Sequence, residues 1–376
     1  MTNYYLVVRD RLGDYKGVLN NFAELSYSRA ENDKGMLDVI LFPDADMSLF
    51  QDDSLIEVHR STGGFATYIE DVYLITMTTK AYSGNKILIN IHGENGNGIL
   101  GRRIIPYATG TDYSDKEDLA DDVMKDIVTE NFLQDSVNQE DTTRKITDYL
   151  TVTGKSSSSI IVCKQVSMMN VLAALQDIAN EVKQTEVEVG SNAYLAFNMV
   201  YLGLNKFEFN TYTEMLGENH TMGTNEPLIF APEIGNFIDA ELTYNFIDER
   251  NYVYCGGQGI GSEREVIEDK VISRSTVSPF SRREIFVDGR ETDDVNVLAS
   301  MAKSELYTYR ARIELTGTLL DSPSVLYGVH YHFGDMVTIK FDDIYIDVHI
   351  DKISITFQNG NEKLDIKVTG TFLGYD

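Results

Sequence analysis

Short apolar runs separated by polar breaks dominate the first hundred residues. In KILINIHG at residues 86–93, Ile87, Ile89 and Ile91 share one face, which is the period of two that strands show. Glycine-containing pairs such as Gly13-Asp14 punctuate the runs. The pattern predicts six strands in this part of the chain: Tyr4–Val8, Phe22–Tyr27, Met36–Phe42, Leu55–His59, Tyr68–Ile75 and Lys86–His92.

The period changes in the middle of the chain. Ser114 and Glu117 match a capping box, which predicts a helix that begins at Ser114 and runs to about Phe132. Two further amphipathic stretches predict helices at about Met168–Lys183 and directly after Asp294, whereas Ala193–Tyr212 returns to strand patterning. The apolar stripes of the three helices are expected to face the core: Leu119, Val123, Met124, Ile127 and Val128; Val171, Leu175, Ile178 and Val182; Leu298, Met301, Ala302 and Leu306.

The last third of the chain repeats the first. AELSYS at 23–28 recurs as AELTYN at 240–245, and KILINIHG at 86–93 recurs as KLDIKVTG at 363–370. The pair Ile56 and Val58 corresponds to Val337 and Ile339. Residues 56–74 and 337–355 match at a constant offset of 281, and a shared 3-then-2 apolar spacing predicts the same β-bulge in both. Because the matches keep their order, the sequence predicts a duplicated β-module.

The predicted fold is therefore mainly β, of the α+β class. It has a first β-module at residues 1–104, a helix-containing middle region at 105–235 and a second β-module at 236–376. The second copy carries an insertion of 64 residues between its first two matched segments, and the inserted segment lies at about 250–315.

A glycine-rich stretch, NYVYCGGQGIGSER at 251–264, is the strongest hint of chemistry. A dinucleotide fingerprint would need glycine where Ser262 stands, and a P-loop would need lysine there. Four carboxylates follow between positions 263 and 269, where they would repel a bound phosphate. We therefore expect a backbone bend, in which glycines allow positive φ and close approach of two strands, and not a nucleotide site.

Other candidate sites are sparse. His330 and His332 would share one face of a strand with Asp335 nearby, but no other histidine cluster supports a metal site, and a structural role is favoured. Carboxylates number 59, so a glycosidase pair stays open, although any two of them are uninformative. Cys163 and Cys255 fit neither a zinc motif nor a disulfide framework. The sequence assigns no catalytic, cofactor-binding or metal-binding residue, and it predicts neither an enzyme nor a cofactor.

The net charge says more about possible partners than any motif in the sequence does. Fifty-nine acidic residues against 32 basic ones give a formal net charge of −27. Such a surface repels nucleic acid and anionic lipid. It has two interpretations: simple solubility, or a surface that must not stick to DNA passing close by. No apolar run approaches 18 residues and no leader pattern opens the chain, so neither membrane insertion nor a signal peptide is expected.

Several stretches, taken in order, resemble one known family. They are FAELSYSRAENDKGMLDVILFP, NGNGILGRRIIPY followed by an acidic helix, SMMNVLAALQDIANEV, IFAPEIGNFIDAELTYNFIDERNYVYCGGQGIGSER, and RREIFVDGRE with LYGVHYHFGDMVTIKF. In this order the chain resembles the tail-hub proteins of long-tailed bacteriophages, the siphoviruses. These are related to the trimeric baseplate hub of contractile-tailed phages.

The resemblance implies two β-barrel-like tube modules per chain and a homotrimeric, pseudo-sixfold ring. The ring would connect the sixfold tail tube or distal tail protein to a threefold central spike or fibre. It would meet the tape measure protein and line the channel through which genomic DNA is ejected without specific binding. The resemblance also implies a structural virion protein of the tail tip or baseplate, synthesised and assembled in the host cytoplasm. The alternative is a tail-tip adhesin that binds or cleaves carbohydrate, which the absence of Trp weakens, although 22 Tyr are present.

Overall fold

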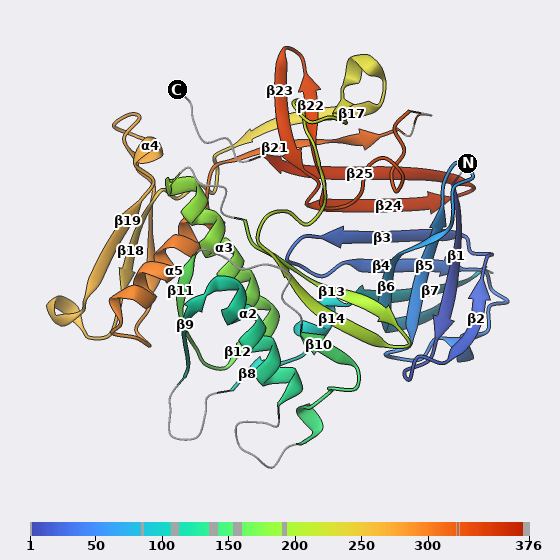
Figure 1. The fold of residues 1–376 in the computed structure, drawn as a ribbon, viewed down its shortest axis with the longest axis horizontal. Coiled ribbons are helices and arrows are strands. Elements are labelled where there is room, and N and C mark those ends of the chain that lie inside the picture. Colours follow the sequence, from blue (N-terminus) through green and yellow to red (C-terminus); the bar gives the residue numbers. More distant parts are fainter. Residues whose placement is uncertain are drawn as a thin grey trace.

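The computed structural model describes residues 2–83, 86–106, 113–134, 142–152, 160–189, 194–320, 322 and 324–370. Strands dominate it, as the sequence predicted, and the largest element is one sheet of eleven strands (Figure 1). The three helices longer than one turn lie beside this sheet, together with several smaller sheets. None of the helices within the described ranges has the length and apolar character that a membrane crossing needs.

All six strands predicted in the first hundred residues are confirmed. The first part of the chain forms β1 (Asn3–Arg9), β2 (Tyr15–Leu19), β3 (Glu24–Ala30), β4 (Met36–Leu41), β5 (Leu55–Ser61), β6 (Tyr68–Ser83) and β7 (Lys86–Asn95). Strand β2 was not predicted, because YKGVL has no fully buried position and so shows no apolar face. Strand β6 runs eight residues past the predicted end at Ile75, through exposed positions that carry no apolar pattern.

The large sheet contains strands from both predicted β-modules. Its last-third members are β17 (Phe237–Asn245), β21 (Arg312–Leu319), β24 (Lys352–Gln358) and β25 (Asn361–Gly370). The order is β17-β21-β25-β24-β3-β4-β7-β6-β5-β1-β2, and every pairing is antiparallel. According to the repeated segments, β17 is the equivalent of β3, β25 is the equivalent of β7 and β24 is the equivalent of β6. Two four-strand units of the same order therefore lie side by side, joined where β24 pairs with β3.

The two copies differ at two points where the sequence predicted likeness. Ile56 and Val58 lie in β5 within the large sheet, whereas Val337 and Ile339 lie in β22 (Met336–Phe341), which pairs with β23 (Ile344–His349) outside it. The predicted shared bulge is present only in the first copy. There the β5–β6 register shifts at Val58, whereas β24 pairs with both neighbours without a shift.

The helices confirm the apolar stripes and correct one boundary. Helix α2 spans Ala120–Val128 and continues into a π-helical turn, η2 (Thr129–Leu133). The capping box is wrong, because Ser114–Leu119 forms strand β9 against β11 (Ile161–Val166), so its backbone groups are used in a ladder. Helices α3 (Val171–Val189) and α5 (Val295–Thr308) lie where the sequence placed them, and Asp294 caps α5 by accepting from the Asn296 N–H.

The remaining elements are short. A three-stranded sheet contains β10 (Leu150–Val152), β14 (Lys206–Tyr212) and β13 (Ala196–Gly203), and the inserted segment folds into β18 (Tyr252–Gly256), β19 (Val266–Lys270) and β20 (Glu284–Asp288). The others are α1 (Asn97–Leu100), β8 (Ile104–Ile105), β12 (Met169–Asn170), β15 (Asn219–His220), β16 (Ile229–Phe230) and α4 (Ile272–Ser275), with 3₁₀ turns at Met47–Leu49, Thr142–Arg144, Pro232–Ile234 and Gly261–Glu263.

Three apolar cores hold these elements together. The largest lies on one face of the long sheet and contains side chains from both copies, such as Leu25 and Ile91 from the first and Ile355 and Ile366 from the second. A second core surrounds α2 and α3, and a small third core lies between α5 and the sheet of the inserted segment. Because one core serves both copies, neither four-strand unit buries its inner face alone.

Candidate functional site

The glycine-rich stretch is a tight structural bend. Arg264 lies across it and donates to the carbonyl oxygens of Gly256 and Gly257, each at 2.8 Å, while it also pairs with Asp288. A Cβ on Gly256 would lie 2.7 Å from Arg264 Nε, and one on Gly257 would lie 2.9 Å from Leu298 of α5. The glycines are therefore needed because an arginine and a helix pack directly against the backbone.

The two candidate histidines lie in a turn and not on a strand, which corrects the sequence prediction. His330 Nδ1 accepts from the Leu326 N–H at 2.9 Å, so this ring closes the turn. Asp335 accepts from the backbone N–H groups of His332 and Glu218, at 2.6 and 2.7 Å. Among the described residues, no group of three or more His, Cys, Asp or Glu side chains is arranged to hold a metal ion.

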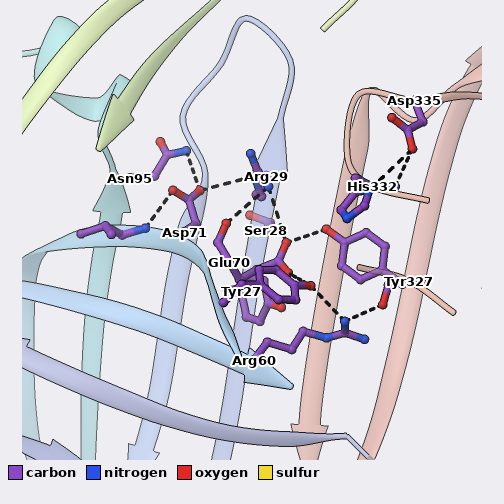
Figure 2. Close-up of polar contacts among 12 residues, drawn as sticks. Tyr27, Ser28, Arg29, Arg60, Glu70, Asp71, Asn95, Tyr327, His332 and Asp335 are labelled. Atoms are coloured by element: carbon purple, nitrogen blue, oxygen red, sulfur yellow. Dashed lines mark hydrogen bonds and ion pairs between the residues drawn. The ribbon is translucent and has the colours of Figure 1, made fainter. Parts of the chain in front are cut away.

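A buried ion pair joins the two copies of the repeat. Arg60 of β5 is 0% exposed, and its Nε and Nη2 donate to Glu362 of β25 at 2.9 and 2.8 Å. Its Nη1 donates to the Tyr327 carbonyl at 2.6 Å (Figure 2), and the Tyr4 hydroxyl contacts the same Glu362. Burial alone would lower the pKa of Arg60, but the contacts with Glu362 hold it above its ordinary value, so the guanidinium stays charged.

A second set of charged side chains lies in the same junction between the two copies (Figure 2). The Tyr327 hydroxyl donates to Glu70 at 2.6 Å, and burial together with Glu70 raises the pKa of that tyrosine well above its ordinary value. Arg29 of β3 lies 3.5 Å from Glu70 and 3.6 Å from Asp71, and it covers the ring of Phe333. The segment around Tyr327 and Phe333 comes from the second copy, so the polar network spans both.

This network fixes the relative position of the two four-strand units. Each buried charge has an opposite charge or a hydroxyl within contact distance, which is the condition under which charges are tolerated in a core. Most of these side chains are buried, whereas Arg29 and Asp71 are partly exposed, and the charged ones are paired with one another. The arrangement is suited to a rigid joint and offers no nucleophile or general base to a substrate.

A third polar junction joins the sheet to the helices. Glu31, directly after β3, contacts Lys183 of α3 at 2.5 Å and Tyr194 at 2.5 Å; burial would raise the pKa of Glu31, but these contacts lower it below its ordinary value. Asp351, whose carbonyl accepts from the Glu31 N–H at 2.8 Å, has a buried Oδ1 without a hydrogen-bond partner. Burial, together with the Glu31 carboxylate, raises the pKa of Asp351 to about 7. These residues border a polar cavity of about 440 Å³.

The junction predicts a pH-dependent stability. Because the folded-state pKa of Asp351 lies above its unfolded value, this group favours the folded state at low pH, and that contribution is lost as pH rises toward about 7. We expect Asp351→Asn to be more stable than the wild type, by an amount that grows by roughly 2–3 kcal/mol between pH 5 and pH 8. Urea unfolding at the two pH values measures this, with Asp343→Asn, an exposed carboxylate of the same module, as the charge control. A constant difference at both pH values would contradict the assignment.

Part of the face of the large sheet opposite the main core, from β21 to β7, carries polar rows. Direct cross-strand partners form one row of Lys363, Thr356, Ser26, Asp38 and His92, which crosses from the second copy to the first. A parallel row contains Thr318, Asp365, Ser354 and Ser28. Together the two rows contain five hydroxyl groups, two carboxylates, one lysine and one histidine.

Comparison with known proteins identifies a family that matches this chain. The family described as Siphovirus ReqiPepy6 Gp37-like protein matches residues 5–369, nearly the whole chain. The chain belongs to this family. The resemblance to siphovirus tail proteins predicted from the sequence is thereby confirmed. No curated protein matches the sequence.

Solved structures share the fold of this tail protein at low sequence identity. The tail protein from Neisseria meningitidis MC58 is 12% identical with a TM-score of 0.57, over 98% of this chain and 96% of that one. The 43 kDa tail protein of prophage MuSo2 from Shewanella oneidensis is 11% identical with a TM-score of 0.56, over 97% and 98%. Prophage tail protein gp18 from Listeria monocytogenes EGD-e is 11% identical with a TM-score of 0.54, over 97% and 94%. The chain therefore shares its fold with phage tail proteins over nearly its whole length.

The sequence did not predict the buried network of this tail protein, although a signal was present. Arg60 continues the inward-facing series Ile56 and Val58 of β5, and Glu362 continues the series Leu364 and Ile366 of β25. A charged residue at an inward position of a strand is unusual unless it is paired. Each charge could have been recognised as unusual in its own strand. That the two charges pair across 302 positions follows only from the order of the strands in the folded sheet.

Proposed function

We propose that three copies of this chain close into a ring that forms the hub of the phage tail. The ring would connect a sixfold tail tube or distal tail ring on one side to a threefold spike or fibre on the other. The supporting observation is the repeated strand order, β17-β21-β25-β24 followed by β3-β4-β7-β6. Two alike units per chain give six units around a ring of three copies, so a threefold object can match a sixfold one.

The free strand edges support closure of this ring. Among the residues that the structure describes, strand β17 pairs with β21 on one side only, and β6 beyond Ile75 pairs only with β7. Within the chain, the outer strand of one unit, β24, pairs antiparallel with the first strand of the other, β3. The equivalent contact between chains would join β6 of one copy to β17 of the next. It would cover two edges that otherwise invite uncontrolled pairing.

The polar face of the sheet suits the wall of a DNA channel. In a ring closed through strand edges, one face of the sheet points inward, and the apolar face is already occupied by the core. The inward face would then be the one that presents the two polar rows, in which hydroxyl groups lie among charges of both signs. With carboxylates beside its cations, such a wall would attract phosphates only weakly, so genomic DNA would pass without specific binding.

The remaining parts of the proposal concern location and partners. The hub would be part of the virion at the tail tip or baseplate, after synthesis and assembly in the host cytoplasm. Its partners would be the distal tail protein or tail tube, the spike or fibre and the tape measure protein. The alternative is a tail-tip adhesin that binds or cleaves carbohydrate, for which the chain offers 22 Tyr but no Trp.

The decisive measurement is the mass of the purified protein. We expect a particle of three chains, each of 42.3 kDa, with a threefold axis in negative-stain images. The ratio of trimer to monomer should rise with concentration, because association follows mass action. A particle with another stoichiometry, or images of the tail tip in which this chain lies off the threefold axis, would contradict the proposal.

A further inference from the structure

The two four-strand units of the large sheet share one register. Direct cross-strand partners form two rows of three: Leu25, Val39 and Ile91 across β3, β4 and β7, and Leu242, Leu315 and Val368 across β17, β21 and β25. The repeated segments match the ends of these rows, because AELSYS aligns with AELTYN and KILINIHG aligns with KLDIKVTG. Equivalent positions in the two units can therefore be assigned residue by residue.

Tyr82 of β6 has the position in the first unit that Ile355 of β24 has in the second. Ile355 lies opposite Leu364 of β25. Tyr82 lies opposite Ile87 of β7, which is the equivalent of Leu364. The offset of 281 found in the sequence would match Ile355 with Leu74 instead, but Leu74 already pairs with β5 on its outer side. Tyr82 is thus the equivalent residue on the part of β6 whose outer edge has no partner strand among the described residues.

Burial differs sharply between the two sets of equivalent positions. In the joint inside the chain, Ile355 lies directly opposite Tyr27 of β3, and their side chains are 0% and 2% exposed. The equivalent of Tyr27 in β17 is Tyr244, which is 44% exposed, and Tyr82 is 75% exposed. The chain therefore places a large aromatic side chain on each of its two open edges, at the positions that the joint inside the chain buries.

Both tyrosines lie on the face of the sheet that carries the main core. Tyr82 is the direct partner of Ile87, and Tyr244 follows Leu242 by two residues. Ile87 and Leu242 both pack against the main core. A single exposed tyrosine is ordinary, but two at matched positions on the two open edges would continue that core if the edges met. This continuity favours a second copy of the chain as the partner, because it brings to β6 the kind of edge that β24 meets inside the chain.

We propose that Tyr82 of one copy lies directly opposite Tyr244 of the next, in the register of the joint inside the chain. The antiparallel register then places Thr79 opposite Ile247, another exposed apolar residue. Directly opposed aromatic side chains stabilise paired strands, and here their burial would hold two copies together. This inference rests on the proposed ring, and it adds the register and the side chains through which the copies recognise each other.

Disulfide formation tests the register directly. Two single-cysteine chains carry either Tyr82→Cys or Tyr244→Cys, after Cys163→Ser and Cys255→Ala have removed the native thiols. Residues directly opposite each other on antiparallel strands lie within the Cα separation that a disulfide spans. We expect an oxidised mixture of the two chains to give a cross-linked dimer on a denaturing gel. Each chain alone should give none, because the contact joins two different edges.

The neighbouring position in β17 provides the matched control. Thr243 lies on the opposite face of the strand, so Thr243→Cys should cross-link with Tyr82→Cys roughly tenfold less than Tyr244→Cys does. Equal cross-linking at positions 243 and 244 would overturn the inference, because it would show that no register is fixed. So would cross-linking of either single variant with itself, the absence of the link in a self-associated particle, or a wild type that does not self-associate.

Fluorescence provides a second test that keeps an aromatic side chain in the contact. The chain contains no Trp, so Tyr244→Trp introduces a single indole whose emission reports its burial. As concentration drives association, we expect this emission to shift to shorter wavelength. Tyr15→Trp, at an exposed position of β2, should keep its emission and serves as the control. An assembled particle in which the emission of Tyr244→Trp equals that of the dilute chain would contradict the inference.

The inference and the proposed ring fail in different ways. A particle of three chains without the link between positions 82 and 244 overturns the register and leaves a ring that closes through another contact. A chain that carries both Tyr82→Cys and Tyr244→Cys should give covalent species up to a trimer. Linked species that continue beyond three chains would support the contact and overturn the ring. The presence of the link and the size of the largest covalent species therefore decide the two proposals separately.

Discussion

Replacing Arg60 with Leu is expected to lower the free energy of unfolding by about 3–5 kcal/mol, because it leaves Glu362 as an unpaired charge in the core. Arg60 is fully buried, and it also supports the Tyr327 carbonyl, so the substitution removes contacts on both sides of the joint between the two copies. Urea unfolding followed by circular dichroism measures the loss. The slope of the transition should stay near its wild-type value if the fold is retained.

Two companion variants separate the ion pair from simple truncation. With Arg60→Leu and Glu362→Leu combined, no buried charge is left unpaired, and we expect much of the lost stability to return. Arg290→Leu removes an exposed arginine that pairs with Asp288, and it should change stability little. If the single variant Arg60→Leu were as stable as the wild type, the ion pair would fix the relative position of the two copies without adding to the free energy of unfolding.

Proline at the free half of β6 is expected to abolish the ring. Successive N–H groups of a strand point to opposite edges, so of Thr79 and Lys80 one donates toward β7 and the other toward the open edge. Proline removes one N–H. We expect one of the two variants, Thr79→Pro or Lys80→Pro, to keep the fold yet remain monomeric, because its missing N–H belongs to the contact between copies.

The other proline variant is the matched control. It should disturb the β6–β7 ladder and lower the unfolding midpoint, because its lost N–H belongs to a pairing inside the chain. Mass measurement at matched concentration, together with circular dichroism, distinguishes the two. If both variants assemble like the wild type, the open edge of β6 is not the contact, and closure of the ring through strand edges fails.

The sequence predicted elements correctly where one face is buried and the other is exposed. It failed where polar residues determine which element forms. The strands of the first module, and the stripes of α3 and α5, alternate between buried and exposed positions with a clear period. The capping-box prediction at Ser114 and Glu117 was wrong because a capping box and a polar edge strand can have the same residues. Only the partner strand β11 shows which of the two forms. The second half of β6 has no buried face and so no signal.

The candidate site was less predictable than the fold, because its residues meet only through topology. The repeat predicted two alike modules, and four strands from each predicted module lie in one sheet. It did not predict that β24 and β3 would form a single sheet, or that Arg60 would meet Glu362. The inward position of both charges was readable from their own strands, but the partner of each lies in the other copy of the repeat.

The pairing of β24 with β3 also sets the order of events during synthesis. Leu25 lies opposite Phe357, and Ala30 lies opposite Lys352, so one side of β3 lacks this partner until more than 300 further residues have been synthesised. Contacts so distant along the chain make for slow folding. In the meantime the nascent protein exposes an unpaired strand, which is a site for aggregation or for binding by chaperones. A chain whose two β-modules share one sheet thus completes that sheet only after β24 has been made.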